Sequence, residues 1–85
     1  MKTILNSEWS EGGGGLLPSC ITISHSEGAA MPFSTHLACR QEDGSIGKMS
    51  GHYFDDSLDA LANFAKRAKE HRERYLVVSV GWEAN

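Results

Sequence analysis

The sequence predicts a single α+β domain in which a small antiparallel sheet is covered on one face by one amphipathic helix. Three observations lead to this fold class: alternating apolar residues between 19 and 54, a helical stripe over 56–73, and a further alternating segment at 75–82. The expected order of the elements in this domain is therefore β-β-β-α-β. A chain of 85 residues has the length of one domain with a small core.

Residues 1–18 are predicted to form a flexible, glycine-rich lead-in to a single α+β domain at 19–85. Within the lead-in, Lys2 to Leu5 could form a short strand. Four consecutive glycines, Gly12 to Gly15, lose the most backbone entropy on ordering and favour a mobile loop. A phosphate-binding loop is the alternative, but that motif continues into Lys-Ser/Thr and a helix, whereas Leu16-Leu17-Pro18 follows here.

The segment 19–54 is typical of β structure. Ile21 and Ile23 alternate with small polar residues, and the run from Phe33 to Arg40 alternates again, with Phe33, Thr35, Leu37 and Cys39 on the inward face. Asp43-Gly44 is a strong turn signal, because this pair adopts positive φ at little cost. The residues from Ile46 to Phe54 then return as the antiparallel partner, although two glycines there indicate a bulge or a close backbone approach.

The helix is predicted over 56–73. Asp56 or Ser57 can cap its first turn, where neighbouring carboxylates also favour the positive end of the helix dipole. At 100° per residue, one stripe of apolar residues is expected to face the sheet. Its members are Leu58, Leu61, Phe64, Ala65 and Ala68.

The last predicted strand, 75–82, is apolar on both faces. One helix is about 10 Å wide and covers only about two strands, so part of the sheet should stay uncovered. We therefore predict self-association, as a homodimer, or partner binding through this strand. The residues expected to mediate it are Val77, Val78, Val80 and Trp82. The alternative is a monomer in which the lead-in closes the sheet.

No catalytic, metal or cofactor site is predicted, and the chain is not expected to be an enzyme. Cys20 and Cys39 are expected to be buried free thiols, with a disulfide or a reactive thiol as alternatives. A small enzyme using Cys39 and a histidine is a further alternative, but neither cysteine begins a predicted helix, where a thiolate would be stabilised. The histidines lack the spacing of metal ligands; they are His25, His36, His52 and His71.

The net charge of −3 argues against direct binding to DNA or to an anionic membrane as the main activity. Acidic residues in loops and at the helix start, together with one tryptophan, are the candidate partner-binding surface. They are Glu8, Trp9, Glu11, Glu42, Asp43, Asp55 and Asp56. Ordinary solubility is the simpler explanation for the acids. Residues 66–85 hold five of the eight basic residues, so a small nucleic-acid-associated regulator using the basic end of helix 56–73 is the alternative function.

The N-terminus lacks the apolar central segment of a secretory signal, and no run approaches the roughly 18 apolar residues of a membrane span. The sequence therefore predicts a cytoplasmic protein without membrane association.

The junction Tyr53-Phe54-Asp55-Asp56-Ser57, followed by Leu58, Leu61 and Phe64, resembles small proteins of phages and mobile elements. Among these are anti-CRISPR inhibitors built from a small antiparallel sheet and one or two helices. The likeness extends from about Phe33 to Phe64. The resemblance implies a non-enzymatic inhibitor or accessory factor in the cytoplasm of a bacterial host. It also implies that the acidic surface contacts a larger bacterial protein or nucleoprotein complex.

Overall fold

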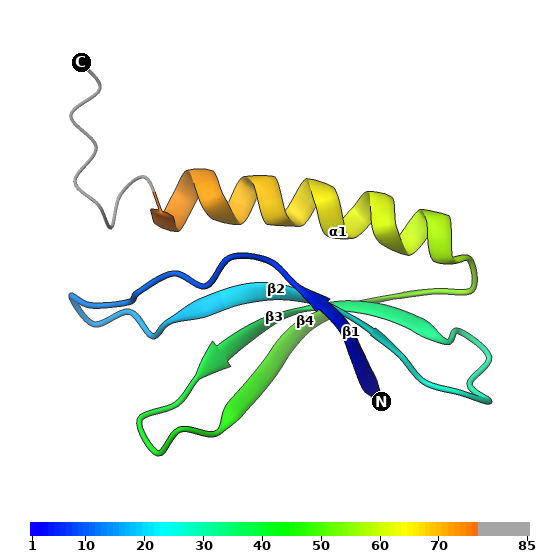
Figure 1. The fold of residues 1–85 in the computed structure, drawn as a ribbon, viewed down its shortest axis with the longest axis horizontal. Coiled ribbons are helices and arrows are strands. Elements are labelled where there is room, and N and C mark those ends of the chain that lie inside the picture. The colour runs from blue at the N-terminus through cyan, green and yellow to red at the C-terminus, as the bar shows by residue number, and fades with distance from the viewer. Residues whose placement is uncertain (77–85) are drawn as a thin grey trace.

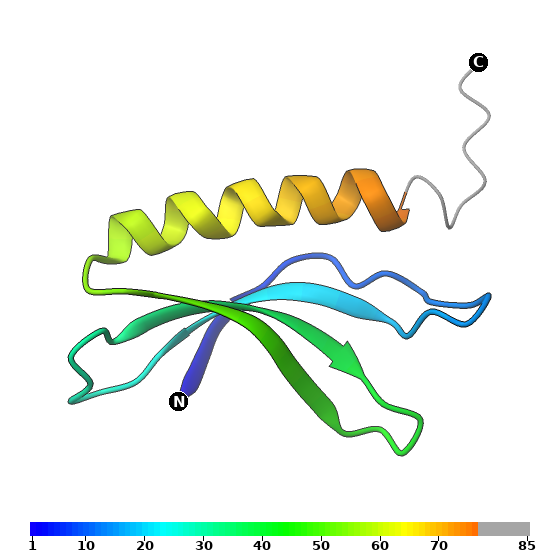
Figure 2. The same ribbon diagram turned by 180° about the vertical axis from the view of Figure 1, so that it is seen from behind.

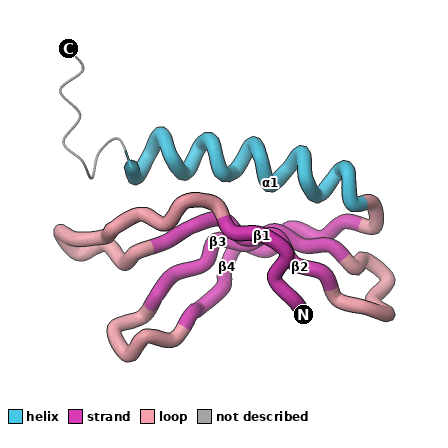
Figure 3. The backbone as a smooth tube through the Cα atoms, in the orientation of Figure 1, coloured by secondary structure: helices cyan, strands magenta, loops and turns pink. Residues whose placement is uncertain are grey.

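A four-stranded antiparallel sheet carries one long helix on one face, which confirms the predicted α+β class (Figure 1). This computed structural model describes residues 1–76. Figure 3 shows the sheet and the helix as two layers, with loops at both ends of the sheet. The elements are β1 (Lys2–Asn6), β2 (Ser19–His25), β3 (Phe33–Arg40), β4 (Ile46–Phe54), α1 (Ser57–His71) and η1 (Arg72–Leu76).

The predicted element order is wrong in one respect, because within residues 1–76 the helix follows all four strands. The short strand expected at Lys2 to Leu5 forms as β1 and supplies the fourth strand of the sheet. Tyr75 and Leu76, where the strand 75–82 was expected to begin, lie in η1, a π-helical turn that continues α1. Helical hydrogen bonding thus continues into residues whose composition favours a strand. The rest of that predicted strand lies outside the described residues.

Each strand pairs with its neighbour in the sequence, in the order β1-β2-β3-β4. In the central pair, Ile21 lies opposite Leu37 and Ile23 opposite Thr35. The predicted turn between β3 and β4 is confirmed, because the Gly44 N–H donates to the Gln41 carbonyl at 2.9 Å and Gly44 has φ +89°.

The pairing of β3 with β4 contains a bulge between Thr35 and Leu37. On β4 it includes Ser50, which has φ +56°, and Gly51. A Cβ atom at Gly51 would lie 2.6 Å from Nε2 of His36, so a larger residue at this position would displace the His36 ring. The bulge expected from the glycines of β4 is therefore present.

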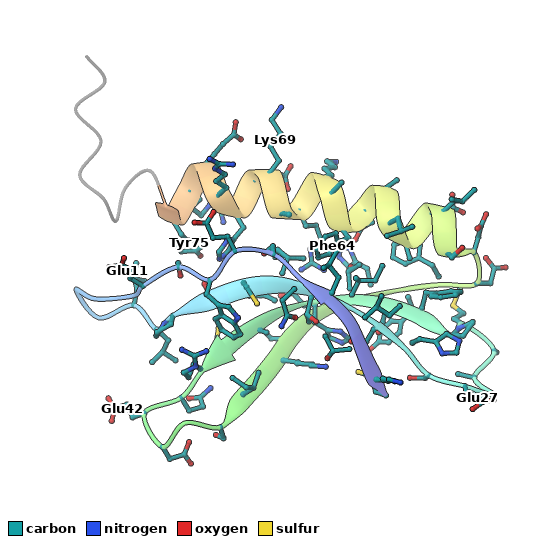
Figure 4. The ribbon with its side chains drawn as sticks, in the orientation of Figure 1. Glu11, Glu27, Glu42, Phe64, Lys69 and Tyr75 are labelled. Carbon is teal, nitrogen blue, oxygen red and sulfur yellow. The ribbon has the colours of Figure 1, made fainter. Side chains whose placement is uncertain are left out.

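The helix begins as predicted but presents a different face to the sheet. The Asp56 carboxylate accepts a hydrogen bond from the Leu58 N–H at 2.9 Å, which confirms Asp56 as the cap. Ala60, Phe64 and His71 are the buried residues of α1, and Figure 4 shows Phe64 pointing at the sheet. The predicted stripe is wrong for Leu58 and Leu61, which are 71% and 44% exposed, and Ala65 is also exposed. Polar contacts to β2 and β3, described below, hold the helix in this rotation.

The core lies between α1 and the middle of the sheet. It consists of Ile21, Ile23, Ala60 and Phe64, against which the partly buried Phe33, Leu37 and Phe54 pack. Burial of such side chains is the main force that holds the two layers together.

The other face of the sheet carries small and polar side chains that are also buried. Cys20, Thr22 and Ser24 of β2 are each no more than 1% exposed. The sheet bends away from α1 on both sides (Figure 2). Lys48 Nζ of β4 consequently lies 3.5 Å from Ser24 Oγ and 3.5 Å from Met1 Sδ, so the two edges of the sheet approach each other over β2.

No helix within residues 1–76 has the length and apolar character needed to cross a membrane.

Candidate functional site

The four glycines of the lead-in form a tight hairpin. Gly13 and Leu16 exchange backbone hydrogen bonds of 2.8 and 3.0 Å, with Gly14 and Gly15 at the tip in the positive φ region that glycine adopts without strain. The turn carries Leu16 and Leu17, which are 55% and 37% exposed. Bonds from the Ser7 and Ser10 N–H groups to β2 carbonyls continue the pairing from β1 toward this hairpin.

Trp9 lies beside the same hairpin and is fixed by β3. The guanidinium carbon of Arg40 lies 4.6 Å from the centre of the Trp9 ring, and the Arg40 N–H donates to the Pro18 carbonyl at 2.9 Å. Figure 4 shows Glu11 and Glu42 at this end of the molecule and Glu27 at the opposite end. We group residues of the segment 8–17 and of the β3–β4 turn as the hairpin surface, which comprises Glu8, Trp9, Glu11, Leu16, Leu17, Glu42 and Asp43. Of these, Glu8 lines a cavity together with Lys69 and Arg72.

The predicted partner-binding residues are therefore divided between two ends of the molecule. Asp55 and Asp56 lie at the start of α1, away from the hairpin surface (Figure 1). Asp56 caps the helix, and Asp43 accepts hydrogen bonds from the N–H and the hydroxyl of Ser45, so both carboxylates stabilise local structure. The predicted self-association residues, Val77, Val78, Val80 and Trp82, lie outside the described residues.

Three cavities lie beside the C-terminal part of α1 and η1, at the end of the molecule that carries the hairpin. The first, of about 230 Å³, lies between α1 and the sheet. The second, of about 480 Å³, lies over the glycine hairpin and shares Arg74 and Tyr75 with the first. The third, of about 260 Å³, lies on the opposite flank of α1 and is lined in part by Lys69 and Arg72.

Arg67 enters the first cavity as a half-buried cation. Its Nη1 donates to Thr35 Oγ1 at 3.0 Å, and the Thr35 hydroxyl donates to Asn63 Oδ1 at 2.6 Å. Burial lowers the pKa of the Arg67 guanidinium, an effect that the nearby Glu70 carboxylate partly opposes. Within residues 1–76 Arg67 makes no ion pair with a carboxylate. The basic end of the helix thus contains a positioned guanidinium with unused donors.

His71 is the second polar group of α1 that sequence reasoning missed. Its Nε2 lies 2.9 Å from Ser19 Oγ, and Ser19 is in turn bonded to Ser10, so the helix end, β2 and the lead-in are joined. Ring centres of His71 and Tyr75 lie 4.8 Å apart, which places Tyr75 against the cavities. No local pattern indicates that His71 is buried, because Ser19 is 52 residues away in the sequence.

We expect the stability of the fold to fall below pH 6.5 because of His71. Burial lowers the pKa of this imidazole from its ordinary value of 6.5, so the unfolded chain takes up a proton before the folded chain does. The stabilising contribution is fully present above pH 6.5 and is lost as the pH falls through the lower folded pKa. Urea unfolding should give a lower free energy of unfolding at pH 5.5 than at pH 7.5. His71→Gln should reduce this difference, whereas Leu58→Gln on the exposed face should not.

The two cysteines are free and buried, as predicted. Cys20 pairs with Ala38 and Cys39 with Ser19, so the two thiols project from opposite faces of adjacent strands. Burial raises the pKa of the Cys20 thiol to about 11, which disfavours the nucleophilic thiolate. By the same alternation His36 and Cys39 occupy opposite faces of β3. Within the described residues no group of three or more histidine, cysteine or acidic side chains is placed to hold a metal ion.

No family model, curated protein or solved structure matches this chain.

Proposed function

We propose that this chain is a non-enzymatic protein-binding factor, and that the hairpin surface is its contact site. The observation that carries the proposal is the exposure of Leu16 and Leu17 on an ordered hairpin, in a segment that also contains Trp9, whose ring lies against the Arg40 guanidinium. Tryptophan is enriched at the centre of protein interfaces, and exposed apolar side chains that lie close together mark binding surfaces. Following the resemblance noted above, we propose an inhibitor or accessory factor of a phage or mobile element that acts on a bacterial defence complex in the cytoplasm.

The charge around the hairpin surface supports a basic partner. Glu8 and Glu11 flank Trp9 in the sequence, and Glu42 and Asp43 lie at the turn directly after β3. Carboxylates at the rim of an interface speed the approach of a positively charged partner more than they add to final affinity. Proteins that hold nucleic acid in basic grooves are partners of this kind.

Affinity capture from bacterial lysate with the full chain tests this function. We expect a stoichiometric protein partner whose recovery resists nuclease, and Trp9→Ala should weaken its affinity by about thirtyfold or more, about 2 kcal/mol. Leu16→Ser with Leu17→Ser should also lose the partner. Leu58→Ser is the control, because Leu58 is a leucine outside the hairpin surface that is even more exposed than Leu16 and Leu17. Equal retention by all these variants, or no protein partner, would contradict the proposal.

A second candidate function, association with nucleic acid through the basic end of α1, is favoured by one specific observation. Arg67 is held half-buried by Thr35 and makes no ion pair with a carboxylate in the described residues, so its charge is available to a phosphate. The same capture experiment separates the two candidates. Nuclease-sensitive recovery that depends on Arg72 and Arg74, and not on Trp9, would favour this second function.

A further inference from the structure

Two neighbouring cavities at the end of α1 share Arg74 and Tyr75 in their linings. The cavity of about 230 Å³ has an apolar floor, Ile21 and Leu37, and the cavity of about 480 Å³ lies over the glycine hairpin, where Leu16 lines it. Together these volumes fall within the range of about 300–1,000 Å³ that is common for small-molecule sites. We call this space the Tyr75 groove.

Two arginines supply cationic groups to the Tyr75 groove. Arg67 of α1 and Arg74 of η1 both line the first cavity. Thr35 is fully buried and holds one nitrogen of the Arg67 guanidinium at 3.0 Å, so this fork is oriented before any ligand arrives. A pair of guanidinium groups is suited to the oxygens of a phosphate, which they can bind through paired N–H donors.

An aromatic ring and a carboxylate complete the lining. Tyr75 borders both cavities, and its position is fixed by the His71 ring, which is itself bonded to Ser19. The flat face of a tyrosine is a platform on which nucleobases stack. Glu70 also lines the first cavity. It reduces the net positive charge there, but it offers an acceptor for the N–H groups on the edge of a base.

We propose that the Tyr75 groove binds one nucleotide unit, with its phosphate between Arg67 and Arg74 and its base against Tyr75. This site shares Leu16 with the hairpin surface but rests on Arg67, Arg74 and Tyr75, and it gives the second candidate function a defined ligand. A free mononucleotide and one nucleotide of a single strand present the same phosphate and the same base. A free mononucleotide and a nucleotide within a single strand would therefore contact the same residues of the Tyr75 groove.

Titration of the full chain with nucleoside 5′-monophosphates, followed by calorimetry, tests the site. Nucleosides and inorganic phosphate serve as part-ligands, and each should bind at least about tenfold more weakly than the monophosphate, since each lacks the charged or the stacking contact. Arg74→Gln and Tyr75→Ala should each weaken binding by about tenfold or more, whereas Tyr75→Phe should preserve it. Lys66→Gln, an exposed cation of α1 outside the groove, should have no effect.

Arg67→Gln should also weaken binding by at least about tenfold. The Arg67→Gln substitution also removes the hydrogen bond to Thr35 and could unfold the protein. In that case the result for Arg74→Gln decides the test. A single-stranded oligothymidylate distinguishes the two ligands. If it binds no more tightly than the mononucleotide, the ligand is a free nucleotide. If the affinity grows with strand length, the ligand is nucleic acid. No binding of any of these probes, or equal binding by wild type, Arg74→Gln and Tyr75→Ala, would overturn the proposal. If the Arg74→Gln and Tyr75→Ala variants still capture material from lysate in a nuclease-sensitive way, the chain binds nucleic acid at another site. That result would support the second candidate function and refute the Tyr75 groove as its site.

Discussion

Phe64→Ala is expected to lower the free energy of unfolding by about 3–5 kcal/mol, because it removes the largest side chain of α1 from the core and leaves a cavity. Stability of a domain of this size is roughly 5–10 kcal/mol in total, so the variant should be close to unfolded at moderate temperature. Urea unfolding followed by circular dichroism measures the effect directly. Leu58→Ala is the matched control, and we expect it to change stability by less than about 0.5 kcal/mol.

The rotation of α1 can be tested from its other side as well. Ala60 is fully buried where the helix meets the sheet, so Ala60→Leu should overpack the core and cost about 1–3 kcal/mol. The apolar stripe predicted from the sequence excludes Ala60 and includes Leu58. A costly Leu58→Ala together with a harmless Ala60→Leu would restore that predicted stripe and contradict the observed packing.

Thr35→Val is expected to cost about 1–3 kcal/mol although the two side chains have nearly the same shape. The Thr35 hydroxyl donates to Asn63 and accepts from Arg67, so valine leaves two polar groups of α1 without their partner on β3. Thr35→Ser keeps the hydroxyl and serves as the control for this hydrogen bonding. Equal stability of Thr35→Val and the wild type in urea unfolding would show that these bonds do not hold the helix on the sheet.

Local patterns predicted the secondary structure well, because each depends on residues close in sequence. The helix expected over 56–73 forms as Ser57–His71 with Asp56 as its cap, and the Asp43-Gly44 turn joins β3 to β4. The inward face of β3 also follows from simple alternation, as the pairing of Leu37 with Ile21 shows.

The rotation of α1 could not be read from local patterns. Its most apolar stripe contains Leu58 and Leu61, yet the helix turns a small residue, Ala60, to the sheet and buries His71 instead. His71 is tolerated there because Ser19 accepts or donates a hydrogen bond from another part of the chain. Such long-range polar partners leave no periodic signal in either segment.

The candidate site was predictable only in part for a related reason. Glu8, Trp9, Glu11, Glu42 and Asp43 were selected as exposed loop residues. Figure 4 shows Glu11 and Glu42 at the same end of the molecule, while Glu8 lines a cavity with Lys69 and Arg72. The exposed leucines of the glycine hairpin were missed because four glycines favour a mobile segment when considered alone. Their fixed arrangement depends on the Ser10 N–H bond to the Ser19 carbonyl and on the continued pairing with β2.

The pairing of every strand with its sequence neighbour also has a kinetic consequence. Each hairpin closes a short loop, so the entropy lost before the first strand contacts form is small, and we expect rapid assembly of the sheet. The helix comes after all four strands, so during synthesis on a ribosome the sheet segments emerge first. Ile21 and Ile23 then remain without their apolar cover until Phe64 has left the exit tunnel. This nascent intermediate is the species that a chaperone would recognise.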